Sequence, residues 1–403
     1  MTHVCRHCGS PLTHTVIDLG HQPPSNAYLT ADQLLTPEIT YPLQVYVCTN
    51  CWLVQLPAHA TAEELFTPDY AYFSSTSTSW CSHAERFVEQ AVQRLGLREH
   101  SHVVELASND GYLLQYVQRQ KIPCLGIEPT RATAEAARAK GVKTLESFFG
   151  LALAGELEPA DLVVANNVLA HVPDINDFVA GIARLLKPQG QASIEFPHLL
   201  QLLKANQFDT IYHEHYSYLS LGTVQRIAAA YGLQVVDVEQ LPTHGGSLRV
   251  WLAHQGAAER APAVAAVLAA EAAGGLETLE AFAGFQQQAE SAKHALLEFL
   301  LTAKKQGRRV LGYGAAAKGN TLLNYAGIQA DLLATVADRA HSKQGKLLPG
   351  SHIPVISPDQ LASETFDSLL VLPWNLIEEL RHQFPSTDLI TAIPELRHWR
   401  GVH

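Results

Sequence analysis

The stretch His102-Val-Val-Glu-Leu-Ala-Ser-Asn-Asp-Gly111 decides the fold of the central part of the chain. Its first half is a mostly apolar run of strand length, and its second half is a polar loop that ends in one glycine. An amphipathic helix is expected before it, over about residues 84–95, and another after it, from Tyr112. A strand that runs through a short polar loop into a helix is the repeating unit of a parallel α/β sheet.

The same alternation continues toward the C-terminus. Strands are expected at 124–127, near Val142, at 160–166 and at 190–196, with helices over 131–140 and 175–186. This alternation predicts a doubly wound, mostly parallel sheet. Two later segments, 234–238 and 247–253, alternate polar and apolar residues as a terminal antiparallel pair of strands does.

A second α/β unit is expected in the last third of the chain. Residues 257–302 are rich in Ala, Glu and Gln with helical periodicity, which predicts long helices that bridge two domains. Further strands are expected at 309–313, 333–337 and 368–372. The chain therefore divides into three domains, at residues 1–75, 76–255 and 256–403.

Two CxxC pairs lie near the N-terminus, Cys5-Arg-His-Cys8 and Cys48-Thr-Asn-Cys51. Each pair fits a tight turn that directs two thiolates at one ion, and two such turns complete the tetrahedron that Zn²⁺ prefers. Redox pairs are the poorer interpretation, because a redox CxxC opens a helix after a strand. Four thiolates leave His7 and His14 no role as ligands, so we expect a closed, structural zinc ribbon.

Composition argues against several classes of function. The net charge is −11 and no run of Lys or Arg occurs, so a nucleic-acid groove is not expected. The longest apolar stretches have the length of strands, which predicts no membrane span. No apolar segment precedes the first cysteines, so a secretory signal is not expected. We expect a cytoplasmic protein, a monomer or small homo-oligomer, without nucleic-acid or membrane partners.

Acidic and amide side chains follow the expected strands of the central sheet, where open α/β sheets bind ligands. This arrangement resembles the class I S-adenosylmethionine-dependent methyltransferases. The resemblance implies that Glu128 binds the ribose hydroxyls, since a carboxylate accepts two hydrogen bonds. It also implies that Glu105, Ala107 and Asn109 line the methionine end of the cofactor and that Asp110 supports the loop. Ser147 and Phe148 would lie beside the adenine, and Asn166 would contact the amino-acid portion.

The loop Ala107-Ser-Asn-Asp-Gly111 departs from the GxGxG of many methyltransferases, because it holds a single glycine. The same departure argues against a dinucleotide-binding dehydrogenase, since a pyrophosphate needs close approach to the backbone. The plainer alternative is a set of acidic strand ends that are only solvated.

The densest group of chemically capable side chains is Asp209-Thr-Ile-Tyr-His-Glu-His-Tyr216. An extended backbone would put His213 and His215 on one side and Glu214 on the other, whereas a helix would spread them. A second metal site is an alternative, although the spacing is not that of HExxH. Surface histidines are another alternative in a chain with 20 of them.

Six motifs occur in order: the four cysteines, 105–111, 170–173, 211–215, 244–250 and 312–323. With them the whole chain resembles the zinc-containing deoxysugar C-methyltransferases, which methylate TDP-linked 4-keto-6-deoxyhexoses. The resemblance implies a zinc-binding domain at 1–75 and a methyltransferase domain at 76–255. It implies a helical bridge with a Rossmann-like nucleotide-sugar domain at 256–403.

The resemblance also implies the chemistry, which is methylation of a carbon beside a ketone through an enolate. His215 is the implied base, because a neutral imidazole suits proton removal at cellular pH. Glu214 would orient it or polarise the substrate. Tyr212 and His171 would donate hydrogen bonds to the enolate oxygen or to sugar hydroxyls.

Substrate contacts are expected from three further segments. The family places a substrate tyrosine in the region of Tyr70 and Tyr72, and His244 would face the sugar. Arg249 is either a phosphate partner or part of a salt bridge at a strand end. The glycine-rich segment 312–321 is not a Walker A motif. Either it contributes Tyr313, Lys318 and Asn320 to substrate binding, or it is only a tight turn that packs a helix on the sheet.

Two alternatives to C-methylation remain. One is methylation of oxygen or nitrogen on a similar nucleotide sugar or another small anionic substrate. The other is a zinc-bearing binding or scaffold protein with a vestigial methyltransferase fold.

Overall fold

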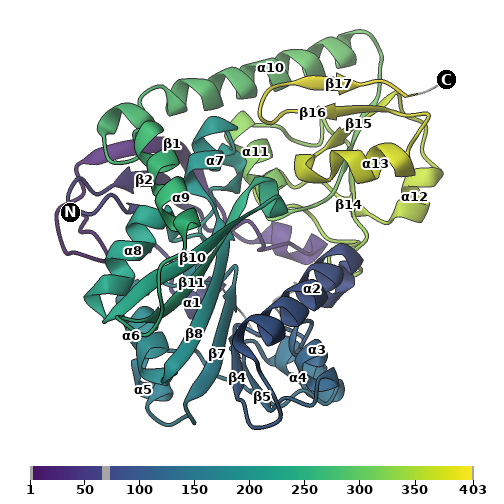
Figure 1. Cartoon of the computed structure of the whole chain (residues 1–403). Coiled ribbons are helices and arrows are strands. Elements are labelled where there is room, and N and C mark those ends of the chain that lie inside the picture. Colours follow the sequence, from purple (N-terminus) through teal and green to yellow (C-terminus); the bar gives the residue numbers. More distant parts are fainter. Residues whose placement is uncertain (1–2, 66–72, 402–403) are drawn as a thin grey trace.

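The N-terminal lobe is built on a small antiparallel sheet. The computed structural model describes residues 3–65 and 73–401. The strands of this sheet, in the order β1-β2-β3-β9, are β1 (His14–Gln22), β2 (Tyr41–Val47), β3 (Val54–Gln55) and β9 (Ser217–Tyr218). The last strand directly follows the 209–216 segment, so that segment joins the lobe to the central domain. Figure 1 shows β1 and β2 close to the N-terminus.

The central sheet confirms the predicted doubly wound arrangement. Its order is β10-β11-β8-β7-β4-β5-β6, and β4 to β8 are parallel. Strand β11 runs antiparallel to both its neighbours, as the alternation predicts. The strands are β4 (Val103–Leu106), β5 (Cys124–Ile127), β6 (Thr144–Leu145), β7 (Ala160–Asn166), β8 (Leu186–Pro197), β10 (Leu233–Leu241) and β11 (Ser247–His254).

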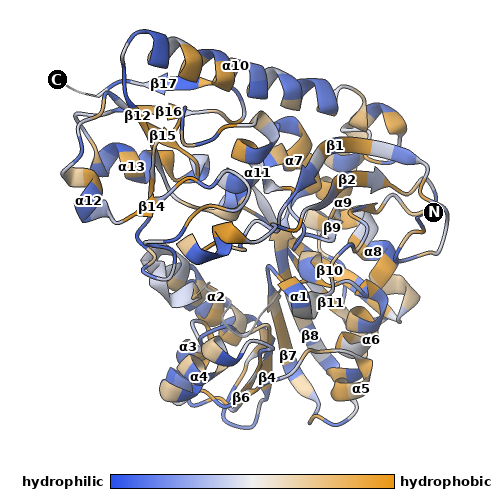
Figure 2. Ribbon diagram, turned by 180° about the vertical axis from the view of Figure 1, so that it is seen from behind, coloured by the Kyte–Doolittle hydropathy of each residue, from blue (hydrophilic) through white to orange (hydrophobic). Residues whose placement is uncertain are grey.

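Helices cover both faces of this sheet with their apolar sides (Figure 2). One face carries α2 (Thr78–Leu95), α3 (Leu114–Arg119) and α4 (Arg131–Ala139). The other carries α6 (Ile175–Leu185), α8 (Leu221–Ala230) and part of α9 (Pro262–Ala273). Helix α2 begins six residues before its expected start, because the Ser77 hydroxyl accepts a hydrogen bond from the Trp80 N–H and caps it.

The C-terminal sheet is also doubly wound, with the order β14-β13-β12-β15-β16-β17. Its neighbouring strands are parallel except for the edge pair β16 and β17. The strands are β12 (Val310–Tyr313), β13 (Val336–Ala337), β14 (Val355–Ile356), β15 (Ser368–Val371), β16 (Asp388–Thr391) and β17 (Arg397–Trp399). Its helices are α11 (Ala317–Ala326), α12 (Pro358–Ala362) and α13 (Ile377–Gln383).

The long helix α10 (Phe285–Lys305) joins the N-terminal lobe to the C-terminal domain. Its buried residues recur at helical spacing and share one apolar core with β1, β2 and the C-terminal sheet. The N-terminal lobe therefore packs against the C-terminal domain on one side. On its other side, three cysteines and Leu53 belong to the core of the central domain.

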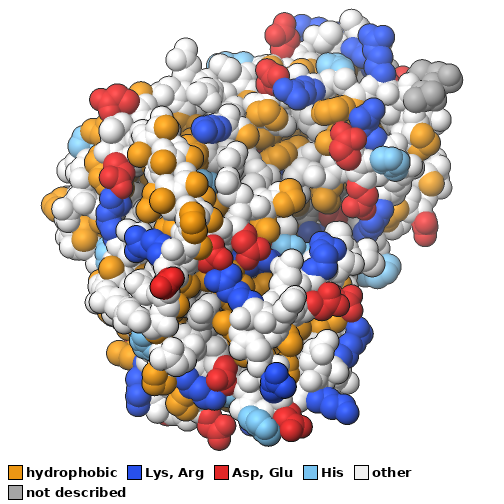
Figure 3. Space-filling view, in the orientation of Figure 1, with side chains coloured by type: hydrophobic (Ala, Val, Ile, Leu, Met, Phe, Trp, Pro, Cys, Tyr) orange, Lys and Arg blue, Asp and Glu red, His pale blue; other side chains and the backbone are white. Residues whose placement is uncertain are grey.

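The remaining helices are short: α1 (Ala62–Leu65), α5 (Leu151–Ala154) and α7 (Leu199–Lys204). Within residues 3–65 and 73–401, no helix combines the length and the apolarity needed to cross a bilayer. Acidic and basic side chains are interspersed over the face drawn in Figure 3.

Candidate active site and metal centre

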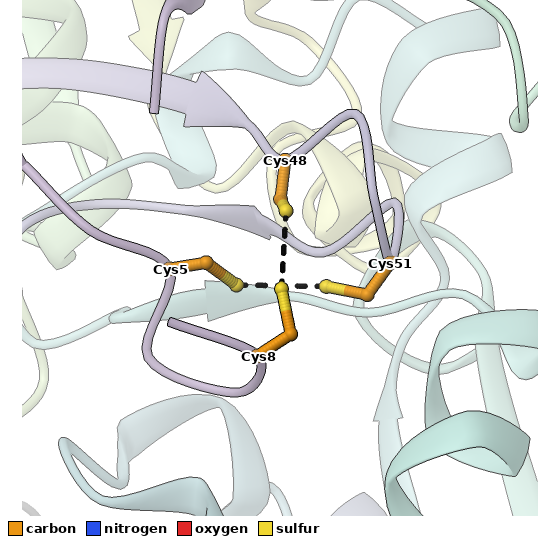
Figure 4. A group of neighbouring side chains, drawn as sticks. All are labelled: Cys5, Cys8, Cys48 and Cys51. Atoms are coloured by element: carbon orange, nitrogen blue, oxygen red, sulfur yellow. Dashed lines mark hydrogen bonds between the residues drawn. The ribbon is translucent and has the colours of Figure 1, made fainter. Parts of the chain in front are cut away.

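The four cysteines converge on one point between the lobe and the central domain. Their sulfur atoms all lie within 4.8 Å of one another, and the Cys5–Cys51 and Cys8–Cys48 pairs are 3.5 Å apart (Figure 4). Four thiolates around Zn²⁺ at 2.3 Å have sulfur–sulfur distances of about 3.8 Å. The cluster therefore fits a tetrahedral zinc ion.

Both CxxC pairs lie in the same kind of turn. The N–H of Gly9 donates to the Cys5 carbonyl, and the N–H of Trp52 donates to the Cys48 carbonyl. Each turn ends on a residue with positive φ, Gly9 at 72° and Trp52 at 64°. A further hydrogen bond, 3.1 Å long, runs from the Gln55 amide to the Cys5 sulfur, a usual way of supporting a bound thiolate.

The two histidines near the cysteines have other partners, as the full set of thiolates predicts. The His7 Nδ1 atom lies 2.8 Å from the Asn176 Oδ1 atom, and His14 Nδ1 lies 2.9 Å from the Thr13 hydroxyl. The four-cysteine site would therefore bind zinc without an open position. Such a closed site stabilises structure and leaves no place for a reacting water.

The loop after β4 lies at the edge of the central sheet where the cofactor is expected. Ala107, Asn109 and Gly111 all have positive φ, so the single glycine of the motif is joined by two residues in left-handed conformation. Asp110 is buried and accepts hydrogen bonds from the Lys140 ammonium at 3.0 Å and from the Ser75 hydroxyl. These contacts tie the loop to α4 and to the segment before α2.

Glu128 lies at the end of β5, next to this loop. Its Oε2 atom accepts from the Asn109 N–H at 2.8 Å, and its Oε1 atom accepts from the N–H of Thr130 at 2.9 Å and from the Thr130 hydroxyl. The Ser147 N–H donates to the Glu128 carbonyl, which brings Ser147 and the exposed Phe148 to the same edge.

Several polar atoms around this edge are buried without a hydrogen-bond partner among the described residues. They include Oε2 of Glu105, the Ser108 hydroxyl and the Oδ1 atoms of Asn166 and Asn167. Burial raises the pKa of Glu105 well above its usual range. Buried polar atoms normally have partners. These oxygen atoms therefore fit a polar ligand with hydrogen-bond donors, such as the ammonium of the amino-acid end of S-adenosylmethionine.

His215 is held in one orientation by its own segment. Its Nδ1 atom lies 2.8 Å from the Thr210 carbonyl, and its ring lies 4.0 Å from the Tyr212 ring and 4.5 Å from the His171 ring. A carbonyl oxygen only accepts, so Nδ1 carries the proton and the neutral ring presents a lone pair at Nε2. Burial lowers the pKa of His215 well below 6.5, which keeps the ring neutral.

The segment that contains His215 is a turn, so neither an extended nor a helical arrangement applies. His213 points the other way, and its Nε2 atom lies 3.3 Å from the Tyr41 carbonyl in the N-terminal lobe. Glu214 accepts a 3.0 Å hydrogen bond from the side chain of Asn26, also in that lobe. The Thr210 carbonyl, and not Glu214, therefore orients His215.

His171 also has a defined tautomer. Its Nδ1 atom lies 2.7 Å from the Glu214 carbonyl, and burial lowers the pKa of His171 to about 4. A neutral ring that donates from Nδ1 can only accept at Nε2. His171 therefore suits a sugar hydroxyl better than an enolate oxygen.

His244 and Lys318 complete the group around His215. Both are close enough to lower the pKa of His215 electrostatically, although they come from different domains. The Asn167 side-chain amide lies 3.2 Å from the His244 Nε2 atom. Burial lowers the pKa of Lys318, and its ammonium donates to Asn375 at 2.9 Å. The site thus lies between the central and C-terminal domains.

Three residues predicted to bind substrate lie elsewhere or are engaged. Arg249 is 2% exposed and pairs with Glu195 at 2.9 Å and Glu239 at 3.4 Å, so it forms the salt bridge rather than an open phosphate site. Tyr313 packs in the apolar core against Phe384. Asn320 is buried, and its amide donates to the Ser25 carbonyl at 2.6 Å. Tyr70 and Tyr72 lie outside the described residues.

The structure also brings to the site three residues that were not among the predicted site residues. Thr210, Asn26 and Asn167 each contact a predicted site residue. Asn26 lies in the run Gln22-Pro-Pro-Ser-Asn26, whose two prolines indicate an ordered turn but no ligand. Only the three-dimensional contact assigns it to the site.

Known families match consecutive parts of the chain. Residues 5–66 match a family described as a zinc binding domain, and residues 80–238 match a methyltransferase domain. Residues 242–394 match the C-methyltransferase C-terminal domain. The C-methyltransferase NovU of Streptomyces niveus is 36% identical over 381 residues, which cover 93% of this chain and 90% of NovU.

Solved structures resemble part of the chain at low identity. The PH0226 protein of Pyrococcus horikoshii OT3 is 15% identical with a TM-score of 0.39, covering 46% of this chain and 95% of that one. Magnesium protoporphyrin IX methyltransferase of Synechocystis PCC 6803, solved with bound SAH, is 14% identical with a TM-score of 0.36. That similarity covers 43% of this chain and 83% of the other.

Proposed function

The chain belongs to the S-adenosylmethionine-dependent C-methyltransferases that carry an N-terminal zinc-binding domain, and from this premise we propose its substrate and mechanism. The substrate is a nucleotide-linked 4-keto-6-deoxysugar, with TDP as the carrier. The methylated atom is a ring carbon beside the ketone. The proposed zinc-binding domain spans residues 1–75, the methyltransferase domain spans 76–255, and the helical bridge with the nucleotide-sugar domain spans 256–403.

The observation that carries the proposal is the state of His215. A buried, neutral imidazole that donates from Nδ1 to a fixed carbonyl presents Nε2 as a base. Methylation of oxygen or nitrogen can also use a base. A base for carbon, however, must remove a proton that is acidic only beside a carbonyl group. The neighbouring cation of Lys318 suits the oxygen of such a carbonyl, where negative charge develops.

Proton removal comes first in the proposed reaction. The Nε2 atom of His215 takes the proton from the carbon beside the ketone, and the electron pair moves onto the ketone oxygen. The Tyr212 hydroxyl and the Lys318 ammonium stabilise that oxygen. S-adenosylmethionine, when bound, would supply the methyl group as an electrophile. The electron pair then returns from the oxygen to the ring carbon, where it forms the new carbon–carbon bond and restores the ketone. His171 and His244 hold the sugar, and Glu214 polarises it.

Cofactor binding is assigned to the edge formed by β4, β5 and β7. Glu105, Ala107, Asn109 and Asn166 would hold the methionine end, with Asp110 supporting the loop. Glu128 would hold the ribose, and Ser147 and Phe148 would flank the adenine. Zinc would be held by the four cysteines, where it stabilises the lobe that contributes Asn26.

A panel of nucleotide-linked sugars tests the proposal. Each sugar is offered with S-adenosylmethionine carrying a carbon-13 methyl group, and NMR then identifies the atom that receives it. We expect a new carbon–carbon bond next to the ketone, only in keto-sugars. A methyl group on oxygen or nitrogen would favour the heteroatom alternative. A chain that does not bind the cofactor would favour a scaffold role.

A further inference from the structure

Trp374 reaches from the C-terminal domain into the central domain. It lies in the short 3-10 turn Trp374–Leu376, which follows β15. Its indole Nε1–H donates a 2.7 Å hydrogen bond to the Oδ2 atom of Asp209. Asp209 belongs to another 3-10 turn, Phe208–Thr210, directly before the Tyr212–His215 segment.

Asp209 is fully buried, so its carboxylate needs hydrogen-bond partners within the protein. Its side chain is 0% exposed, and its Oδ1 atom has no hydrogen-bond partner among the described residues. A buried carboxylate is unfavourable unless it is hydrogen-bonded. The indole N–H, together with the backbone N–H groups of Asp209 and Thr210, therefore holds the carboxylate and the backbone of the turn in one position.

The Phe208–Thr210 turn also orients His215, the proposed base. The residue after Asp209 is Thr210, and its carbonyl oxygen accepts from His215 Nδ1 at 2.8 Å. This hydrogen bond selects the tautomer with a lone pair at Nε2. A displacement of the turn would remove that selection without altering any residue that contacts substrate.

Trp374 also contacts the two other segments that surround His215. A Cβ atom built on Gly245, next to His244, would come within 2.5 Å of the Trp374 ring. The Lys318 ammonium lies 4.8 Å from the centre of the same ring. One indole thus touches the turn of Asp209, the loop of His244 and the side chain of Lys318.

We propose that Trp374 is a positioning residue, through which docking of the C-terminal domain fixes the tautomer of His215 and the place of the His244 loop. The inference rests on the proposed function for its effect on turnover. It makes the C-terminal domain part of the proton-transfer apparatus as well as a substrate-binding domain. An undocked C-terminal domain would leave the central domain with a misoriented base.

The test compares Trp374→Phe with Trp399→Phe in the full-length zinc-loaded protein. Both variants lose an indole donor within the C-terminal domain, but Trp399 donates to Thr391, at the edge of its own sheet. Nitrogen-15 NMR of labelled histidines reports the tautomer of His215, assigned by its absence in His215→Asn. Turnover is measured on the keto-sugar that the wild type methylates.

We expect Trp374→Phe to shift His215 toward the Nε2–H tautomer and to lower kcat by about tenfold, as loss of a hydrogen bond to a charged group does. The Kd for S-adenosylmethionine should not change. Trp399→Phe should match the wild type in both readouts. Asp209→Asn keeps an acceptor for the indole. Its His215 tautomer and its kcat should therefore lie closer to those of the wild type than the values for Asp209→Ala do.

An unchanged His215 signal in Trp374→Phe, with kcat within twofold of Trp399→Phe, would overturn the inference. Asp209→Ala removes the same hydrogen bond from the other side, and it decides the matter if Trp374→Phe does not fold. The NMR comparison needs no substrate. A wild type that methylates no keto-sugar would therefore refute the proposed function while the tautomer shift still tests the role of Trp374.

Discussion

Replacement of Glu128 by Gln tests the proposed ribose site with the smallest possible change. The side chain is 3% exposed and lies between two loops. It accepts hydrogen bonds from the backbone N–H groups of Asn109 and Thr130 and from the Thr130 hydroxyl. A carboxylate has about four acceptor positions, so about one remains for a ribose hydroxyl.

The expected magnitudes follow from these contacts. Gln keeps the volume but turns one acceptor oxygen into an NH₂ donor, which leaves one backbone N–H facing a donor. A buried unsatisfied donor lowers the free energy of unfolding by about 1–3 kcal/mol. Loss of a charge-assisted hydrogen bond to the ribose weakens S-adenosylmethionine binding by about tenfold or more.

Titration calorimetry measures the cofactor Kd, and urea unfolding measures stability. Glu146→Gln is the matched control, because Glu146 lies on the same edge in surface ion pairs with Arg131 and Arg138. Such pairs contribute about 0–1 kcal/mol. If Glu128→Gln binds the cofactor as tightly as Glu146→Gln does, Glu128 is not the ribose ligand and the cofactor site lies elsewhere.

Three further predictions concern the zinc site, the base and the N-terminal lobe. Cys48→Ser removes one of four thiolates, so zinc content and Tm should both fall; metal analysis and thermal unfolding check this, and full zinc at the wild-type Tm would refute it. The acid limb of kcat/KM should lie below pH 6.5, because burial lowers the pKa of His215 and the neutral ring is the active form; a limb above pH 6.5 in the rate profile would contradict this assignment. Asn26→Ala removes a donor to the buried Glu214, and kcat should fall by about fivefold or more at unchanged cofactor Kd. Steady-state kinetics decide, and an unchanged kcat would show that Glu214 needs no support from the lobe.

Features that depend on neighbouring residues in the sequence could be predicted well. Strand β5 has the bounds expected from its apolar run, and the two CxxC pairs form one cluster. Local periodicity and ligand spacing carry this information, since each operates within a few residues. The alternation of strands and helices predicted the doubly wound, mostly parallel central sheet, whereas its strand order comes from the structure.

Contacts between distant segments could not be predicted in the same way. The Asp209–Trp374 and Asn26–Glu214 hydrogen bonds join residues 165 and 188 positions apart, and no local pattern marks either pair. The ion pairs of Arg249 could not be predicted either, because they depend on which strands lie beside β11. The choice between the two roles predicted for Glu214 also depends on a distant contact, because its side chain binds Asn26 while the nearby Thr210 carbonyl orients His215.

The most direct test of the central claim is deuterium exchange into the substrate ring, with S-adenosylhomocysteine bound so that no methyl group can be transferred. We expect exchange at one carbon beside the ketone, and loss of that exchange in His215→Asn. Absence of exchange in every keto-sugar of the panel, or undiminished exchange in His215→Asn, would contradict enolate formation by this base.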